Sequence, residues 1–500
     1  MAAGCLARRS TLAFWIRMAM GSSLYTGVYI GAMTVAVPAD VLSRLKAVLG
    51  AAGWSQDPAR LAPKLVEWRD RWSGNTPFLA LPKTTQEVAA VVGVCFEGGV
   101  PIIPQGGNTG LVGGQIPQGE ILLSTERMGA IRDLDAYDDV VVAEAGVTLA
   151  GVHQAASAAR RRFPLGLASE GSATVGGVVS TNAGGTAVLR YGNTRELVLG
   201  LEAVLPNGEV WNGLRRLRKD NTGYDLKQLL IGAEGTLGVV TAASLKLFPV
   251  PASRAVAMAG LADPRAAMEL LVRARQQAGG GLEAFELIGR RGVEFVLKHI
   301  PGQRDPLARP HPWYVLIEIA ALDREGAPAA MERLLGQALD EGLVGDAALA
   351  QSEAQAQALW SIRENQSAAQ KPEGSAWKHD VSLPLSKVAD FLDQATAAME
   401  AFAPVCRVSA FGHLGDGNIH YDVLPPPGPP DAHAAGREPA ARIVHDIVAS
   451  MGGSISAEHG LGAMKTQEAL RYKSPVEVAA LRALRASLDP KRIMNPRVLF

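Results

Sequence analysis

Four side chains near the C-terminus have the types and spacing of a metal site. His413 and His420 flank the sequence Leu-Gly-Asp-Gly-Asn-Ile, and Glu458 and His459 follow as neighbours. Two imidazoles and one carboxylate can supply the three protein ligands of a divalent transition metal and leave positions open for a substrate. A single histidine at a strand end is more often structural, but the four groups together favour a metal centre.

The residues between the two histidines predict how they are positioned. The Asp-Gly pair between them is typical of a tight hairpin turn, so His413 is expected to end one strand and His420 to lie on the next. Alternation along that second strand places His420 and Asp422 on one face and Tyr421 on the other. A β-hairpin is therefore the element that must present this chemistry.

A glycine-rich loop far upstream has the character of a nucleotide-binding site. Residues 104–111 read Pro-Gln-Gly-Gly-Asn-Thr-Gly-Leu. Successive backbone N–H groups in such a loop can bind a pyrophosphate, and missing Cβ atoms allow its close approach. A Rossmann fingerprint is absent, because no G-x-G-x-x-G stands between a strand and a helix with an acidic residue about 20 positions later. A metal and a nucleotide cofactor together predict redox chemistry on a small hydroxylated substrate.

Composition and length limit the class of protein. The chain has 500 residues, more than one hydrophobic core usually holds, so two or three domains are expected. Lys plus Arg and Asp plus Glu both total 49, so no basic field is available for nucleic acid. Cys5, Cys95 and Cys406 form no C-x-x-C pair, and a reduced cytoplasmic protein is expected.

Residues 1–37 are expected to form an N-terminal extension outside the fold. This segment has no acidic residue, and Arg17 interrupts its apolar stretch, so no transmembrane span is expected. Two interpretations remain open. The segment resembles a signal or transit peptide in being basic and acid-poor, or translation starts at Met33, which we favour.

From residue 38 the pattern of strands, helices and turns changes once, at the proline-containing linker 249–251. Before it, strands are predicted over residues 100–104, 121–124, 140–145, 199–205 and 238–248, and helices over residues 39–70, 85–97 and 149–160. After it, strands are predicted over residues 255–261, 283–288, 313–320, 376–383, 405–413 and 418–424, with helices after Asp263 and near Pro328, Ser386 and Arg442. Such strand–helix units predict a mixed or antiparallel sheet covered by helices on one face.

The first half resembles the flavin-binding domain of the vanillyl-alcohol oxidase and p-cresol methylhydroxylase type, in the FAD-binding oxidoreductase/transferase type 4 family. Five blocks in the same order carry the resemblance, at residues 104–114, 170–177, 181–185, 189–192 and 232–238. It implies an α+β fold with a two-subdomain FAD-binding domain over residues 38–250. An α/β cap domain, a sheet covered by helices, would follow over 251–465, and residues 466–500 would return to the FAD-binding domain.

The resemblance implies that FAD is bound by residues of these blocks and of the C-terminal segment. They are Pro104, Gly106, Gly107, Asn108, Thr109, Gly110, Leu111, Gly171, Thr174, Gly176, Gly177, Asn182, Gly184, Gly185, Gly192, Glu234, Gly238, Val239 and Asn495. Any one glycine pair could simply serve a turn, but the blocks together favour a cofactor. Only Tyr191 could offer a covalent link in these loops, so non-covalent FAD is expected.

From about Trp68 onward the chain resembles the FAD-dependent D-2-hydroxy acid dehydrogenases. This family includes the D-2-hydroxyglutarate dehydrogenases, which are nearest, the D-lactate dehydrogenases and the flavin subunit of glycolate oxidase. The resemblance is strongest over residues 217–229, 360–364 and 377–384, in the metal motif, and at Asn495-Pro496.

Carried over residue by residue, the resemblance implies roles for the polar residues of the second half. His413, His420 and Glu458 would bind the metal, expected to be Zn²⁺ or another divalent transition metal. His459 would take the proton of the substrate hydroxyl as the catalytic base and contact the substrate. Substrate carboxylates would be held by Arg363, Ser367 and Lys378, with the first two at i and i+4 on one helix face.

Asp422, also expected to contact the substrate, departs from the pattern of these relatives, which commonly have Asn there. A carboxylate would repel a dicarboxylate substrate unless it is protonated or paired with a cation. This departure does not affect the expected reaction type, but it leaves the identity of the substrate open. His379 and Asp380, which alternate with Lys378, are expected to be structural.

The implied reaction is oxidation of a D-2-hydroxy acid, first of all D-2-hydroxyglutarate to 2-oxoglutarate, by proton abstraction and hydride transfer to flavin N5. D-lactate and glycolate are the alternative substrates. A catalytically silent flavin electron-carrier subunit is the hypothesis from another class. The electron acceptor is expected among electron-transfer flavoproteins, quinones and cytochromes, and a homodimer is a candidate assembly.

Overall fold

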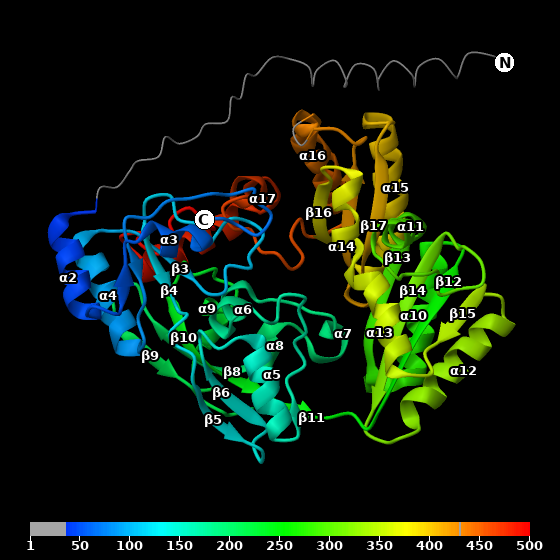
Figure 1. Cartoon of the computed structure of the whole chain (residues 1–500), viewed down its shortest axis with the longest axis horizontal. Helices are drawn as coiled ribbons and strands as arrows, with labels where there is room; N and C mark the ends of the chain where they lie inside the picture. Colours follow the sequence, from blue (N-terminus) through cyan, green and yellow to red (C-terminus); the bar gives the residue numbers. More distant parts are fainter. Residues whose placement is uncertain (1–36, 430–431) are drawn as a thin grey trace. The chain divides into compact units, whose positions relative to one another are not determined.

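The computed structural model describes residues 37–429 and 432–500 (Figure 1). Apart from Val37, the predicted N-terminal extension, with Cys5, Arg17 and Met33, lies outside the described residues, and its interpretation stays a prediction. Among the described residues, no helix has the length and hydrophobicity that crossing a membrane requires.

The first sheet has four short strands in the order β1-β2-β4-β3, and β2, β4 and β3 run parallel. The strands are β1 (Trp54–Ser55), β2 (Leu79–Ala80), β3 (Ile102–Gln105) and β4 (Ile121–Ser124). The helices of this region are α2 (Ala39–Leu49), α3 (Pro58–Leu61), η1 (Ala62–Lys64) and α4 (Thr85–Gly98). The predicted helix over residues 39–70 is wrong beyond Leu49, because Gly50 adopts a φ of 62° and ends it.

The second sheet has five antiparallel strands in the order β5-β6-β10-β8-β9. They are β5 (Ile131–Asp135), β6 (Val140–Glu144), β8 (Val198–Val204), β9 (Val210–Gly213) and β10 (Val239–Lys246), with a separate pair β7 (Arg161–Arg162) and β11 (Phe248–Pro249). The helices are α5 (Leu149–Ala158), α6 (Val175–Thr181), α7 (Val188–Tyr191), α8 (Thr194–Leu197) and α9 (Lys227–Leu230). The three inner strands confirm predictions. The edge strands β5 and β9 escape prediction, because β5 carries three charged residues and β9 is only four residues long and ends in Asn-Gly.

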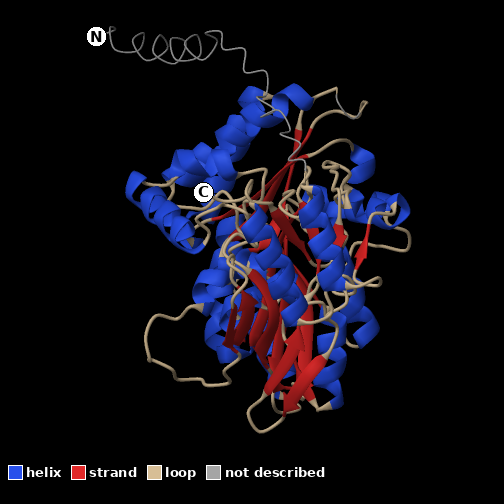
Figure 2. Ribbon diagram, turned by 90° about the vertical axis from the view of Figure 1, so that its left-hand side faces the viewer, coloured by secondary structure: helices blue, strands red, loops and turns tan. Residues whose placement is uncertain are grey.

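The third sheet has seven antiparallel strands in the order β15-β12-β14-β13-β17-β18-β16. They are β12 (Ser253–Leu261), β13 (Leu282–Gly289), β14 (Trp313–Ala321), β15 (Asp346–Leu349), β16 (Trp377–Ser382), β17 (Arg407–His413) and β18 (Asn418–Leu424). Six of these strands confirm the predicted ones. We call this the cap sheet, and Figure 2 shows the strands of the protein among the helices that flank them.

The helices of the cap region begin where local sequence directs them. They are α10 (Pro264–Ala278), η2 (Gly279–Gly281), α11 (Arg290–His299), α12 (Gly326–Asp340), α13 (Glu353–Glu364), α14 (Gln366–Ala369), η3 (Lys371–Glu373), η4 (Leu385–Lys387), α15 (Val388–Phe402), η5 (Leu414–Asp416) and α16 (Ala434–Ser450). As predicted, Asp263 caps α10: its side chain accepts from the N–H of Ala266, and Pro264 occupies the first helical position.

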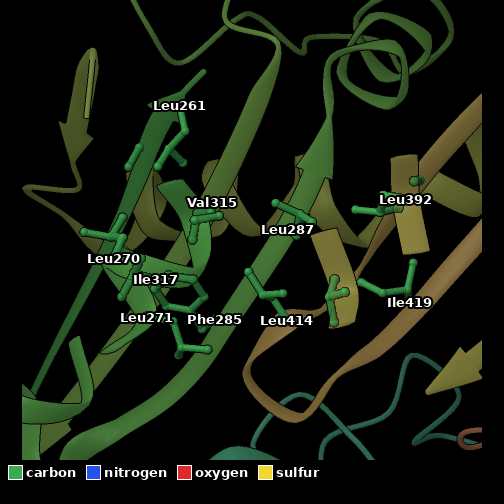
Figure 3. Close-up of a cluster of buried hydrophobic side chains, with 14 of the residues drawn as sticks. Leu261, Leu270, Leu271, Phe285, Leu287, Val315, Ile317, Leu392, Leu414 and Ile419 are labelled. Carbon is green, nitrogen blue, oxygen red and sulfur yellow. The ribbon is translucent and has the colours of Figure 1, made fainter. Parts of the chain in front are cut away.

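Residues that alternate along the cap strands build two different faces. One face packs against α10, α12, α15 and α16 through an apolar cluster that includes Phe285, Leu287, Val315 and Ile419 (Figure 3). On the opposite face, α11, α13 and α14 cover one part through a second apolar cluster. The prediction of helices on one face is therefore wrong. The rest of this second face, on β13, β17, β18 and β16, carries the polar residues described below.

The last residues return to the first sheet. Helices α17 (Thr466–Tyr472) and α18 (Pro475–Leu488) lead to a segment that runs beside β3. The N–H of Ile102 donates to the carbonyl of Ile493, and the N–H of Asn495 donates to the carbonyl of Ile102. Ile493 and Met494 are buried in the core of that sheet.

Candidate metal and substrate site

The hairpin formed by β17 and β18 presents both histidines, as predicted. His413 is the last residue of β17, η5 and Gly417 make the turn, and His420 lies on β18. Gly417 has a φ of 82°, which suits glycine. Tyr421 points into the apolar core, where its ring packs against Phe391, so His420 points to the opposite, polar face.

The neighbouring strand β16 adds two charged side chains to this face. Lys378 pairs in register with Asp422, and Asp380 with His420. Period-two alternation therefore puts all four on the same side of the sheet. His379, between them, points the other way, where its Nδ1 lies 2.7 Å from the carbonyl oxygen of Tyr421. Its expected structural role agrees with this position.

A loop after α16 brings Glu458 and His459 over the polar face. The backbone N–H groups of both residues donate to Oδ2 of Asp380, each at 3.1 Å. Further along the loop, the N–H groups of Leu461 and Gly462 donate to the carboxylate of Glu234, at 2.9 and 2.8 Å. The loop is thus fixed at one end to the cap sheet and at the other to the segment before β10.

The three predicted metal ligands converge, with Glu458 between the two imidazoles. Nε2 of His420 lies 3.5 Å from Oε1 of Glu458, and Nε2 of His413 lies 3.9 Å from Oε2. Ligand atoms of Asp380, His420, Glu458 and His459 also lie within 4.8 Å of one another. Two donor sets that share His420 and Glu458 are therefore possible, one completed by His413 and the other by Asp380 and His459.

Glu286, which sequence reasoning missed, holds the first of these sets. Its Oε1 lies 2.7 Å from Nδ1 of His413, and its Oε2 accepts from Nε of Arg363 at 2.7 Å. A carboxylate that holds Nδ1 in this way directs Nε2 toward the site, an arrangement common among metal-binding histidines. The signal in the sequence is a glutamate within the apolar run of β13, and it gives no hint of its partner 127 residues away.

The electrostatics of the site fit a cation. Burial raises the pKa of Glu458 to about 7, because this carboxylate shares a dry site with Asp380 and Asp416. Burial lowers the pKa of His420, which keeps the imidazole neutral, as a metal ligand must be. Burial also lowers the pKa of His413, but the carboxylate of Glu286 outweighs it and raises the value to about 9. A divalent cation would relieve the repulsion among the carboxylates and compete for His413.

His459 lies between two carboxylates of the site. Its Nδ1 lies 3.3 Å from Oδ2 of Asp380, and its Nε2 lies 3.5 Å from Oε1 of Glu458. Burial lowers the pKa of His459, so the imidazole is neutral. The expected structural role of Asp380 is therefore incomplete. Its carboxylate accepts the hydrogen bonds that hold the loop, and it also lies beside the imidazole of His459. Its alternation with Lys378 is the signal that could have found it.

The predicted carboxylate-binding residues divide into two groups. Arg363, at the end of α13, pairs with Glu286, and its Nη2 lies 3.4 Å from Nε2 of His413. Ser367 lies on α14, and its hydroxyl accepts from Nζ of Lys378 at 3.4 Å. The expected single helix face is wrong, because α13 ends at Glu364 and α14 begins at Gln366. Lys378 also pairs with Asp422 at 3.3 Å.

The glycine-rich loop has free donors for an anion. The backbone N–H groups from Gly107 to Leu111 donate to no acceptor within the described residues. The hydroxyl of Thr174, at the start of α6, is buried and has no hydrogen-bond partner there either. A Cβ at Gly106 would lie 2.2 Å from that hydroxyl, so the two predicted FAD-binding blocks lie against each other. These orphaned donors fit a pyrophosphate.

Other predicted FAD-binding residues are arranged around these blocks. Four of them are non-glycine residues with positive φ, a strained conformation that clusters at ligand sites: Asn108, Asn182, Glu234 and Asn495. Thr109 and Gly110 lie in the same loop as Asn108, Gly171 lies before α6, Gly176 and Gly177 lie in its first turn, Gly184 and Gly185 follow it, Gly192 ends α7, and Pro104 lies on β3. Gly238 and Val239 open β10, and the Val239 side chain is in the core. The contacts of these residues with FAD stay a prediction.

Comparison with known proteins identifies related chains. Residues 76–213 match the family model of an FAD binding domain, and residues 250–499 match that of FAD linked oxidases, C-terminal domain. The mitochondrial D-2-hydroxyglutarate dehydrogenase of Arabidopsis thaliana is 36% identical over 98% of this chain and 87% of its own. That of Bos taurus is 41% identical over 88% and 80%, and the D-2-hydroxyglutarate dehydrogenase of Xanthomonas citri pv. viticola is 38% identical over 89% and 93%.

Solved structures share the fold at low sequence identity. Substrate-bound p-cresol methylhydroxylase has a TM-score of 0.72 at 14% identity, over 92% of this chain and 96% of its own. Alkyldihydroxyacetonephosphate synthase has a TM-score of 0.71 at 15% identity, over 92% and 86%. The expected p-cresol methylhydroxylase-type fold is thereby confirmed.

Proposed function

Because the chain belongs to the FAD-linked oxidases, among relatives named D-2-hydroxyglutarate dehydrogenase, we propose that it oxidises D-2-hydroxyglutarate to 2-oxoglutarate with FAD and a divalent metal ion. The observation that carries the proposal is the position of His459. A neutral imidazole lies 3.5 Å from a candidate metal ligand, Glu458, and 3.3 Å from the carboxylate of Asp380. A base beside a Lewis-acid site is what removal of a hydroxyl proton requires.

Each group of the site has a separate task in this reaction. FAD supplies the two-electron acceptor for the C2 hydride, and a cation held by His413, His420 and Glu458, zinc by preference, supplies a Lewis acid for the hydroxyl. His459 accepts the hydroxyl proton at Nε2, while Asp380 beside Nδ1 keeps that nitrogen protonated and stabilises the imidazolium that forms. The guanidinium of Arg363, which Glu286 holds in place, binds the carboxylate next to C2.

Anaerobic spectroscopy of the purified protein tests the proposal. Adding D-2-hydroxyglutarate should bleach the flavin absorption band, a chelator should abolish the bleaching, and zinc should restore it. If the substrate bleaches the flavin equally well without metal, the proposed role of the metal is contradicted. A protein that holds FAD and metal but is bleached by no D- or L-2-hydroxy acid would contradict the proposed reaction and support a silent electron carrier.

D-lactate is the second candidate substrate, and one contact favours it. The pairing of Lys378 with Asp422 leaves that cation neutralised, which suits a substrate with a single carboxylate. Bleaching by D-lactate but not by D-2-hydroxyglutarate would select this alternative.

We also propose a cytoplasmic location and an electron-transfer flavoprotein, quinone or cytochrome as the acceptor. Within the described residues, Cys95 and Cys406 are free thiols, which agrees with a reducing compartment. Fractionation of cells would test the location, and flavin reoxidation with each class of acceptor would test the partner.

A further inference from the structure

One short loop carries both the candidate base and a candidate metal ligand, and two carboxylates hold it. Residues 458–462 read Glu-His-Gly-Leu-Gly. Asp380, on the cap sheet, accepts from the N–H groups of the first two residues. Glu234, in the N-terminal half of the chain, accepts from those of the last two: the N–H of Leu461 donates to its Oε1 at 2.9 Å, and the N–H of Gly462 donates to its Oε2 at 2.8 Å. Each half of the chain therefore contributes one carboxylate to the position of this loop.

The two glycines of the loop allow it to approach Glu234 closely. Gly460 and Gly462 have φ values of 75° and 50°, a conformation that strains other residues. A Cβ at Gly460 would lie 2.8 Å from Oε1 of Glu234, and one at Gly462 would lie 2.3 Å from the carbonyl oxygen of Val112. That carbonyl also accepts from the next two N–H groups along the chain, at 3.0 and 3.2 Å. The loop thus lies directly against two of the predicted FAD-binding blocks.

Glu234 is itself fixed on the N-terminal side. It has a φ of 50°, its N–H donates to the carbonyl of Ser180 at 2.7 Å, and its carbonyl accepts from Nδ2 of Asn495 at 2.8 Å. A strained backbone of this kind persists only where the surrounding structure determines it. The sequence placed Glu234 among the FAD-binding residues, but both of its carboxylate oxygens accept from the loop.

Hydrogen bonds within the loop region connect its two ends. The N–H of Lys465 donates to the carbonyl of Leu461, and the buried Nζ of Lys465 donates to the carbonyl of Ile455, each at 2.9 Å. The hydroxyl of Ser456 donates to the carbonyl of Gly460 at 2.6 Å. The base and the metal ligand lie between these braced positions. A displacement at the Leu461 end is therefore passed on to them.

We propose that Glu234 is a positioning residue, which sets the place of His459 and Glu458 relative to the flavin by holding their loop against the FAD-binding half of the chain. The inference rests on the proposed oxidation of a D-2-hydroxy acid. Transfer of the C2 hydride requires a substrate held at close range, and a misplacement of about 1 Å can cost about 100-fold in rate. Glu234 acts through the loop and is not assigned a contact with substrate or metal.

Hydrogen exchange of the FAD-loaded protein tests this anchor without any substrate. In Glu234→Ala the amides of Leu461 and Gly462 should exchange about 10- to 100-fold faster, because they lose their acceptors. The Kd of FAD, measured by flavin fluorescence, should change less than about threefold. Glu202→Ala is the matched control, because it removes another buried carboxylate of the same half, one that accepts from the hydroxyl of Thr241. It should leave exchange in the loop unchanged. Unchanged exchange in Glu234→Ala, with a large rise in the Kd of FAD, would overturn the proposal and make Glu234 a ligand of FAD.

Stopped-flow absorbance measures the effect on the reaction. Glu234→Ala should slow flavin reduction by D-2-hydroxyglutarate about 100-fold, with a C2-deuterium isotope effect at least as large as that of the wild type. Reduction by dithionite, which needs neither base nor metal, should keep its wild-type rate. Glu234→Gln retains one acceptor oxygen and should react about tenfold faster than Glu234→Ala, or more. A wild-type rate of substrate reduction in Glu234→Ala would overturn the positioning role.

A pair of glycine variants tests the same contact from the loop side. Gly460→Ala places a Cβ 2.8 Å from Oε1 of Glu234, whereas Gly452→Ala, at the same φ of 75°, meets no described atom within 4 Å. The first should slow flavin reduction by about tenfold or more, and the second by less than about twofold. Equal effects of the two variants would contradict the proposal. A wild type that is bleached by no hydroxy acid overturns the proposed function, whereas the exchange measurement still decides whether Glu234 anchors the loop.

Discussion

In the glycine-rich loops the candidate binding atoms belong to the backbone, whereas on the cap sheet they belong to side chains. The N–H groups from Gly107 to Leu111 are unpaired within the described residues, and the chain conformation alone directs them. On the cap sheet, imidazoles and carboxylates are held by further carboxylates, such as Glu286 behind His413. A backbone site depends on local conformation, and a side-chain site depends on partners brought from elsewhere in the fold.

The largest effect is expected when a shared metal ligand is removed. His420 belongs to both possible donor sets, so His420→Ala should lose the metal and slow substrate-dependent flavin reduction by roughly 10³-fold or more. FAD should remain bound, because the loops do not depend on the metal. Elemental analysis and stopped-flow absorbance measure the two effects, with His433→Ala as a control for loss of a histidine. Retention of stoichiometric metal would contradict the metal assignment.

A substitution of His459 distinguishes a general base from a metal ligand. His459→Asn should slow flavin reduction by roughly 10²- to 10⁴-fold, because a general base is lost, and leave metal content unchanged. If metal is lost together with activity, the donor set of Asp380, His420, Glu458 and His459 replaces the one containing His413. Metal analysis of His413→Ala gives the reciprocal result.

A substitution at Glu286 tests how strongly metal affinity depends on the carboxylate that holds a metal ligand in place. Glu286→Gln keeps the shape but loses the charge that orients His413 and Arg363. Metal affinity should fall about 10- to 100-fold, with FAD affinity unchanged. Competition with a chelator measures the first and fluorescence of released flavin the second; unaltered metal affinity would mean that Glu286 serves only Arg363.

The smallest effect is expected in the predicted FAD site. Thr174→Val removes one buried hydroxyl that has no protein partner among the described residues, so the Kd of FAD should rise about 3- to 10-fold, the value of one hydrogen bond. Metal content should not change. Ser244→Ala removes another buried hydroxyl without a described partner, inside β10, and FAD affinity should then stay constant. An equal effect of both variants would point to general destabilisation.

Local sequence predicted the hairpin because two local rules suffice for it. An Asp-Gly turn fixes the connection, and alternation along β18 fixes which side chains share a face. The same rules failed for the helix beyond Leu49, where one glycine with positive φ ended it. They failed again at Asn365, where the break between α13 and α14 separated Arg363 from Ser367. Local patterns thus locate elements better than their ends.

The sequence by itself determined the donor types, the hairpin that presents two of them and the glycine blocks expected to bind FAD, because turn chemistry and strand periodicity act within a few residues. Only the tertiary structure decided which groups hold these donors in place. Glu286 reaches His413 across 127 residues, and Asp380 reaches the N–H of His459 across 79. Such pairings arise from packing and from the need to compensate buried charge, and neither has a period that a sequence displays.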